Sequence, residues 1–182
     1  MKKTVIGITV VGKDREGIVA VFTNFVFENG GNIEKVNQNV IKGLFGMYLE
    51  VSFTKTVDVK KFDSGIQFLS KKEKMDVSTH HETNSEKNIA ILVTKEPRCI
   101  ETILDAAKKK LLQGSISVII GTEKTLETIT KKAKIPFIVI GDANQEKAEE
   151  KIMEICKKRE IDLIVLARYM KILSPNFVWR YP

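Results

Sequence analysis

Between residues 45 and 53, hydrophobic side chains occupy every second position, and small or polar residues stand between them. This period of two predicts a strand with one buried face. Three further extended stretches are expected at residues 4–11, 33–41 and 75–81. Two helical patterns lie among these strands, with apolar faces formed by Ile18, Phe22, Phe25 and Val26, and by Phe62, Ile66 and Leu69. The order β-α-β-β-α-β predicts a ferredoxin-like domain over residues 1–84.

The pattern changes after a polar stretch at residues 80–88, which we interpret as a linker. Continuous apolar runs now replace the alternation, as expected for strands that are buried on both faces. These runs are residues 89–93, 116–120, 137–140 and 163–167, and helical patterns at residues 97–111, 123–132 and 145–159 separate them. The order predicts a parallel sheet with right-handed crossovers. The fold class is therefore α/β: a ferredoxin-like domain, then a partial Rossmann-like α/β domain over residues 85–182.

The net charge of +7 raises the question of nucleic-acid binding. The lysine clusters, however, fall in the last turns of predicted helices, where cations complement the helix dipole. The sequence contains no nucleic-acid-binding motif, so no nucleic-acid partner is expected. No apolar run approaches the roughly 20 residues that a membrane span needs, so no membrane partner is expected either. The N-terminal run is too short and too broken for a signal peptide, which favours a cytoplasmic protein. Cys99 and Cys156 form no C-x-x-C or Cys/His cluster, so we expect buried free thiols and no metal.

Asp14 precedes the first predicted helix and is expected to cap it, while Gly17 leaves the N–H groups of the first turn open. This stretch, together with Gly30-Gly31-Asn32-Ile33, resembles the ACT domain, a small-molecule sensing module. The resemblance implies an amino-acid effector and a homo-oligomer formed through ACT domains. The implied effector contacts are Asp14, Gly17, Ile18 and Asn32. A purely structural role for Asp14 and Gly17, as cap and packing glycine, stays open.

Ligands of open parallel sheets bind beyond the carboxyl ends of the strands, and residues 168–173 follow such an end. The stretch from Leu166 to Pro175 resembles the folate-binding loop of formyltetrahydrofolate hydrolases and transformylases. Joined to an ACT domain, it is similar to the formyltetrahydrofolate deformylases. The resemblance implies hydrolysis of 10-formyltetrahydrofolate to tetrahydrofolate and formate, which supplies purine synthesis, with no cofactor besides this substrate. The implied folate-binding residues are Met170, Lys171, Ile172 and Leu173.

The turn after the run at residues 89–93 contains no glycine and places Glu96 where a transformylase binds phosphate, which favours water as the formyl acceptor. Residues 1–182 contain no counterpart of the catalytic Asn, His and Asp of the family. His80 and His81 match no part of that motif and are expected to be exposed. We therefore expect no catalytic residue, an N-terminal portion of the enzyme, and an apolar sheet edge at residues 161–167 that promotes association. A non-catalytic ACT sensor, or one half of a split enzyme, remains the alternative.

Overall fold

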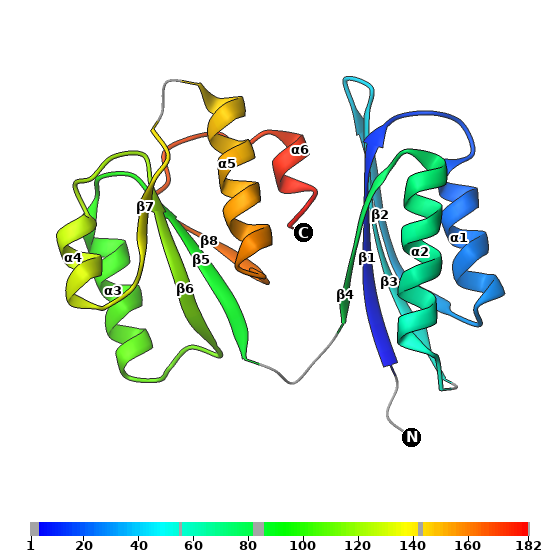
Figure 1. Cartoon of the computed structure of the whole chain (residues 1–182), viewed down its shortest axis with the longest axis horizontal. Helices are drawn as coiled ribbons and strands as arrows, with labels where there is room; N and C mark the ends of the chain where they lie inside the picture. Colours follow the sequence, from blue (N-terminus) through cyan, green and yellow to red (C-terminus); the bar gives the residue numbers. More distant parts are fainter. Residues whose placement is uncertain (1–3, 55, 82–85, 142–143, 182) are drawn as a thin grey trace. The chain divides into compact units, whose positions relative to one another are not determined.

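The computed structural model describes residues 4–54, 56–81, 86–141 and 144–181 (Figure 1). The chain forms two compact units. Unit 1 contains the described residues up to 81, together with residues 178–180. Unit 2 contains the described residues from 86 to 177, together with Tyr181. Among the described residues, no helix has both the length and the apolar character that crossing a membrane demands.

Unit 1 is built on a four-stranded antiparallel sheet with the strand order β2-β3-β1-β4. The strands are β1 (Thr4–Lys13), β2 (Asn32–Ile41), β3 (Leu44–Phe53) and β4 (Asp76–His81). Both helices, α1 (Ile18–Glu28) and α2 (Val59–Glu73), cover the same face of the sheet (Figure 1). The ferredoxin-like prediction for the first part of the chain is therefore confirmed.

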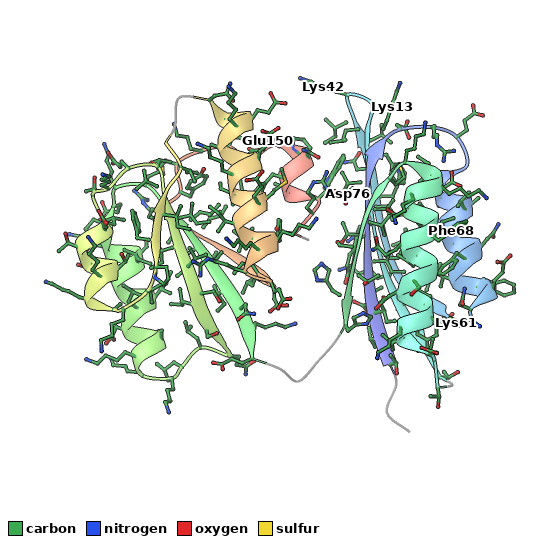
Figure 2. All side chains as sticks on the ribbon, in the orientation of Figure 1. Lys13, Lys42, Lys61, Phe68, Asp76 and Glu150 are labelled. Carbon is green, nitrogen blue, oxygen red and sulfur yellow. The ribbon has the colours of Figure 1, made fainter. Side chains whose placement is uncertain are left out.

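The core of unit 1 lies between the sheet and its two helices. The alternating residues of β3 point into it, as their period of two predicts, and all are at most 2% exposed: Phe45, Met47, Leu49, Val51 and Phe53. The ring of Phe62 on α2 lies 5.3 Å from the rings of both Phe25 and Phe53, measured between centroids. On the outer side of α2, Phe68 is 70% exposed (Figure 2). The predicted apolar faces of the two helices are thus the ones that pack on the sheet.

The N-terminus of α1 differs from the prediction. Its N-cap residue is Gly17, whose φ of 81° lies in the left-handed region, and no side chain caps the helix there. Asp14 is not the cap, because the chain needs three more residues to turn from β1 into the helix. Its backbone N–H instead donates to the carbonyl of Gly43, at 2.8 Å. At its other end, α1 stops at Glu28, just before Gly30.

Unit 2 is built on a parallel sheet with the strand order β7-β6-β5-β8. The strands are β5 (Lys87–Val93), β6 (Gly114–Gly121), β7 (Phe137–Val139) and β8 (Leu163–Ala167). The helices are α3 (Pro97–Lys108), α4 (Glu127–Lys132), α5 (Gln145–Lys158) and the short α6 (Pro175–Val178). The predicted alternation of strands and helices is confirmed, with β8 at one edge of the sheet.

Two separate cores explain why the strands of unit 2 are continuously apolar. Ala90 and Leu92 of β5 pack in one cluster with residues of α5, while Ile89, Ile91 and Val93 pack in another with residues of α3. Successive side chains of a strand point to opposite faces, so a sheet that is covered on both faces requires apolar residues at every position.

Four predicted features of unit 2 and of the linker before it are wrong in detail. Helix α3 ends at Lys108, and the chain turns through Lys110 with a φ of 55°, so Leu111 lies beyond the helix and is 71% exposed. Helix α4 begins at Glu127 rather than at residue 123. The cysteines also differ from each other, because Cys156 is buried as predicted while Cys99 is only half-buried. The predicted linker is shorter than residues 80–88, since β4 extends to His81 and β5 begins at Lys87; residues 82–85 lie outside the described ones.

Candidate functional site

The first candidate site follows the carboxyl end of β8. Strand pairing places Ala167 beside Val93, so the segments that leave β5 and β8 start at the same edge of the sheet. The next residue, Arg168, adopts a left-handed conformation with a φ of 55°. Its carbonyl oxygen accepts a hydrogen bond from the hydroxyl of Thr94, which follows β5, at 2.7 Å. Residues 168–174, which we call the β8 loop, therefore begin at a fixed turn.

The N-terminal part of α5 holds the other end of the β8 loop. Glu149 is only 4% exposed, and its Oε1 accepts from the backbone N–H of Ser174 at 2.8 Å. Its Oε2 accepts from the hydroxyl of Ser174. The side-chain amide of Gln145 donates to Glu149 Oε1 at 3.0 Å and also to the carbonyl of Ile172. Two side chains of one helix thus bind backbone groups of the β8 loop on both sides of Leu173.

The predicted folate-binding residues lie between these anchors, and they divide into two groups. Met170 is 70% exposed, Ile172 is 89% exposed, and Lys171 is exposed as well. Leu173 and Tyr169 are half-buried and pack against the core on the α5 side of the sheet. Burial, and secondarily the negative charge of Glu149, raises the pKa of Tyr169 above its ordinary value, so this phenol stays protonated. The loop thus exposes two apolar side chains, with Lys171 between them and the exposed Arg168 at its start.

Helix α3 begins beside this edge of the sheet, after β5. Its N-cap residue is Glu96, whose carboxylate accepts from the backbone N–H of Arg98 at 3.4 Å, and Pro97 occupies the first turn as predicted. A helix N-terminus usually attracts anions through its unpaired N–H groups. Here a carboxylate of the chain itself already occupies that position, and its charge disfavours a second anion.

The second candidate site is the turn between β1 and α1 in unit 1. Asp14 is exposed, and the space around Gly17 is open, since a Cβ added there would meet no atom within 4 Å. The side chain of Ile18 is 1% exposed and belongs to the core, so only its backbone can face a ligand. Arg15 in the same turn forms an ion pair with Glu73 of α2.

The structure does not bring all predicted effector contacts together. Asn32 begins β2 and lies opposite Ser52, which in turn lies opposite Val5 near the start of β1. Asp14 follows the far end of β1. The 11 residues of α1 also separate Gly17 from Asn32, and a helix of this length extends about 16 Å. Within one chain, these two groups lie at opposite ends of the unit.

The two histidines lie in β4, not in an exposed linker. His80 is exposed as predicted, but His81 is half-buried, and its Nε2 lies 3.0 Å from Oδ2 of Asp63 on α2. The expected exposure of His81 is therefore wrong, because this last residue of the predicted strand packs beside Asp63 of α2. Throughout the part of the chain that the structure describes, no three His, Cys, Asp or Glu side chains are grouped so that they could hold a metal ion.

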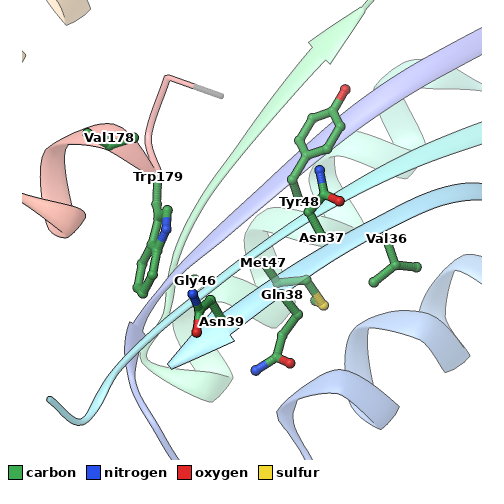
Figure 3. Close-up of a pocket in the computed structure, with 9 residues that line it drawn as sticks. All are labelled: Val36, Asn37, Gln38, Asn39, Gly46, Met47, Tyr48, Val178 and Trp179. Atoms are coloured by element: carbon green, nitrogen blue, oxygen red, sulfur yellow. The ribbon is translucent and has the colours of Figure 1, made fainter. Parts of the chain in front are cut away.

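Unit 1 also carries a groove of about 480 Å³ along β2 and β3. Amide side chains line one side of it, and Tyr48 contributes an aromatic ring (Figure 3). Its lining consists of Val36, Asn37, Gln38, Asn39, Gly46, Met47, Tyr48, Val178 and Trp179. None of the predicted effector or folate-binding residues is among them.

Sequence reasoning missed the three side chains that hold the β8 loop, namely Thr94, Gln145 and Glu149. One signal was available for Glu149. It precedes Ile152 by three positions and Cys156 by seven, so it lies on the apolar stripe of α5. A carboxylate on a buried helical face needs hydrogen-bond donors, and this predicts a polar partner packed against the helix. The identity of that partner, 25 residues further along the chain, has no local signal.

An antiparallel ferredoxin-like unit followed by a parallel α/β unit defines a two-domain protein of the ACT-plus-formyltransferase class. Residues 4–80 match the family model of the ACT domain, and residues 87–182 match the family model described as Formyl transferase. The chain therefore belongs to the formyl transferase family, with an ACT domain at its N-terminus.

Curated relatives align with both parts of the chain. The chain is 32% identical over 176 residues to formyltetrahydrofolate deformylase of Bacillus subtilis (strain 168), a match that covers 93% of this chain and 58% of that protein. It is 29% identical over 175 residues to the deformylase of Escherichia coli (strain K12), covering 93% and 60%. A crystal structure of formyltetrahydrofolate deformylase from Burkholderia mallei ATCC 23344 superposes with a TM-score of 0.58 at 18% identity, covering 97% of this chain and 64% of that one, and supports the fold alone. The chain thus spans about three fifths of the length of the curated relatives.

Proposed function

We propose that this chain binds the folate of a formyltetrahydrofolate deformylase reaction, in which 10-formyltetrahydrofolate and water give tetrahydrofolate and formate. The β8 loop is the proposed binding segment, with Met170, Lys171, Ile172 and Leu173 as contacts. The observation that carries the proposal is the exposure of Met170 and Ile172 on a loop whose backbone is anchored at both ends. Exposed apolar side chains on a fixed backbone suit a flat, apolar ring system. The similarity to named deformylases supports the same substrate.

The N-terminus of α3 favours water as the formyl acceptor. A transferase that acts on a phosphorylated acceptor needs a site for the phosphate, and a helix N-terminus after the first parallel strand commonly supplies one. In this chain Glu96 caps that helix with a negative charge. Hydrolysis needs no anion there, so the carboxylate is compatible with a deformylase and unfavourable for a transferase.

We expect residues 1–182 by themselves to bind folate without turning it over. Deformylation requires a group that stabilises the oxyanion and a group that transfers protons. No Asn-x-His segment occurs in residues 1–182, and both histidines lie in β4 of unit 1. Formate release by the purified chain at an enzymatic rate would contradict this expectation. The proposal includes a cytoplasmic location and no cofactor besides the folate substrate.

Calorimetric titration with the stable analogue 10-formyl-5,8-dideazafolate tests the binding proposal. The wild-type chain is expected to bind it, and Ile172→Asp is expected to weaken binding at least tenfold, because it places a charge against the ring. Since Ile172 is 89% exposed, this change leaves the core intact. The matched control is Leu111→Asp, a change at another exposed apolar position of unit 2 outside the loop, 71% exposed, which should bind like wild type. Equal affinities for wild type and Ile172→Asp would refute the assignment.

We further propose that unit 1 senses an amino acid, with Asp14, Gly17, the backbone of Ile18 and Asn32 as contacts. The open space at Gly17 supports an approach to the N-terminus of α1. One amino acid cannot reach both ends of α1, so contacts to Gly17 and Asn32 together require two chains. This requirement agrees with the expected homo-oligomer. An effector that binds to a chain shown by sedimentation to be monomeric would contradict the shared site.

A further inference from the structure

We propose that Glu149 is the positioning residue of the β8 loop, with Gln145 as its partner, and that the loop cannot hold its ligand-binding conformation without a hydrogen-bonding side chain at this position. The expected effect on folate affinity rests on the proposed function, whereas the expected effect on loop order depends only on contacts within unit 2. It assigns a role to two side chains of α5 that are not among the predicted folate contacts.

Glu149 is the acceptor in all three of its hydrogen bonds. Three donors, the Ser174 N–H, the Ser174 hydroxyl and the Gln145 amide, converge on its two oxygens. A carboxylate that is 4% exposed is strongly disfavoured unless such donors replace its water. Hydrogen bonds to an ionised acceptor are also stronger than those between neutral groups. Glu149 is therefore built to accept from one particular backbone position, which is Ser174.

The second contact of Gln145 extends this arrangement into the loop. Its amide donates to Glu149 and to the carbonyl of Ile172. Ile172 is consequently fixed through its backbone while its side chain is 89% exposed. In addition, the Ser174 hydroxyl oxygen accepts from the N–H of Phe177 at 3.2 Å, which links the carboxylate to the start of α6. The same carboxylate thus sets both the loop and the helix that follows it.

Burial alone does not explain why a glutamate rather than an apolar residue stands at position 149. A leucine at this place on the apolar stripe of α5 would satisfy the core without any hydrogen bond. The carboxylate instead fixes the end of the β8 loop, because only a Ser174 N–H that points at α5 can reach it. With its end fixed in this way, the loop leaves the side chains of residues 170–172 exposed.

The test measures loop order and binding in four variants. Amide hydrogen exchange, followed residue by residue by NMR, reports the protection of Ser174, and calorimetry with 10-formyl-5,8-dideazafolate reports affinity. In Glu149→Ala, the Ser174 amide is expected to exchange at least tenfold faster, and the affinity for the analogue is expected to be at least tenfold weaker. Glu149→Gln keeps one oxygen for the Ser174 N–H, and its amide can donate to the Ser174 hydroxyl, so it should restore both values to within about threefold of wild type.

The controls separate positioning from general loss of structure. Glu150 is exposed on the same helix, one position further on (Figure 2), and Glu150→Ala should match wild type in both measurements. The chemical shifts of the β5 amides should stay at their wild-type values in Glu149→Ala, because a general loss of structure would disturb the whole sheet and not only the β8 loop. If Glu149→Ala does not fold, Gln145→Ala is the replacement. Gln145 is exposed, and its loss is expected to accelerate exchange at Ser174 about threefold.

Two results would overturn the inference. One is an unchanged Ser174 exchange rate and affinity in Glu149→Ala; the other is a change in the β5 chemical shifts that is as large as the change at Ser174. If the wild-type chain does not bind the analogue, the proposed function fails together with the folate part of the inference. The exchange rates of Glu149→Ala and Glu149→Gln then decide by themselves whether the carboxylate holds the loop.

Discussion

The two candidate sites both begin where a strand of the sheet ends and the chain enters a left-handed turn, but they are held very differently. In unit 2, side chains from two other segments bind the backbone of the β8 loop through Thr94, Gln145 and Glu149. In unit 1, the turn after β1 has a backbone hydrogen bond from Asp14 to Gly43 and an ion pair on its outer side. The first site is organised before any ligand arrives, and the second has little in its contacts to fix it.

The difference has a consequence for binding. Ordering a backbone segment costs about 1–2 kcal/mol for each residue, so a loop that is already ordered retains more of its contact energy as affinity. We therefore expect folate binding in unit 2 to depend on distant anchors, and effector binding in unit 1 to depend on residues that touch the effector. Substitutions in the two turns should separate these cases.

The largest expected difference is in stability. Glu149→Ala leaves the N–H and hydroxyl of Ser174 without their acceptor and should lower the free energy of unfolding of unit 2 by about 2–3 kcal/mol. Asp14→Ala removes an exposed side chain and should change unit 1 by less than about 0.5 kcal/mol. Urea denaturation followed by NMR signals of β6 and β3 reports the two units separately. A larger loss from Asp14→Ala than from Glu149→Ala would reverse the comparison.

Most of the fold could be predicted because its signals are local. The period of two in β3 and the continuous apolar runs of unit 2 each reflect how many faces of a sheet are covered. The errors lie at element ends. Asp14 has the right chemistry for a cap, but Gly17 turns the chain first. Leu111 fits the helical spacing of α3, but the chain leaves the helix at Lys109 and Lys110. No glycine stands there to mark the end of the helix in the sequence.

The candidate sites could be located from sequence but not assembled from it. The carboxyl end of β8 is an expected ligand position in any open parallel sheet, and residues 170–173 follow it. The bond from Glu149 to Ser174 spans 25 positions, and the pair of Asp63 with His81 spans 18. Such pairings depend on how elements pack, which a pattern along one segment does not encode. The separation of Asn32 from Gly17 is invisible for the same reason.

A pH titration distinguishes the units by a different route. Burial raises the pKa of the Cys156 thiol from 9.0 to about 11, partly offset by a hydrogen bond with Tyr181. The unfolded thiol ionises near pH 9, whereas the folded one keeps its proton until about pH 11. This contribution to stability is therefore complete below pH 9 and is lost as the pH rises towards 11. Two pKa units correspond to about 2–3 kcal/mol.

Unit 2 should lose stability by this route in alkaline solution, and unit 1 should not, because both cysteines of the chain lie in unit 2. Stability of each unit is measured by urea denaturation between pH 8 and 11. The control is Cys156→Ala, which removes the titrating group and should flatten the slope, leaving the smaller contribution of Tyr169, whose pKa is also raised. An unchanged slope in this variant would show that the Cys156 thiol is not the responsible group.

The smallest expected effects concern the left-handed residue of each turn. Gly17 has a φ of 81° with open space around it, so Gly17→Ala is opposed only by backbone conformation and should cost about 1 kcal/mol. Arg168→Gly relieves a φ of 55° but adds freedom to the unfolded chain, so a gain of only about 0.5 kcal/mol is expected. For units of this size, 1 kcal/mol shifts the melting temperature by about 4–8 °C. The stability changes of Gly17→Ala and Arg168→Gly are expected to have opposite signs if Thr94 and the two side chains of α5, rather than Arg168, hold the turn of the β8 loop. A loss of stability in Arg168→Gly would show instead that the arginine side chain helps to hold the loop.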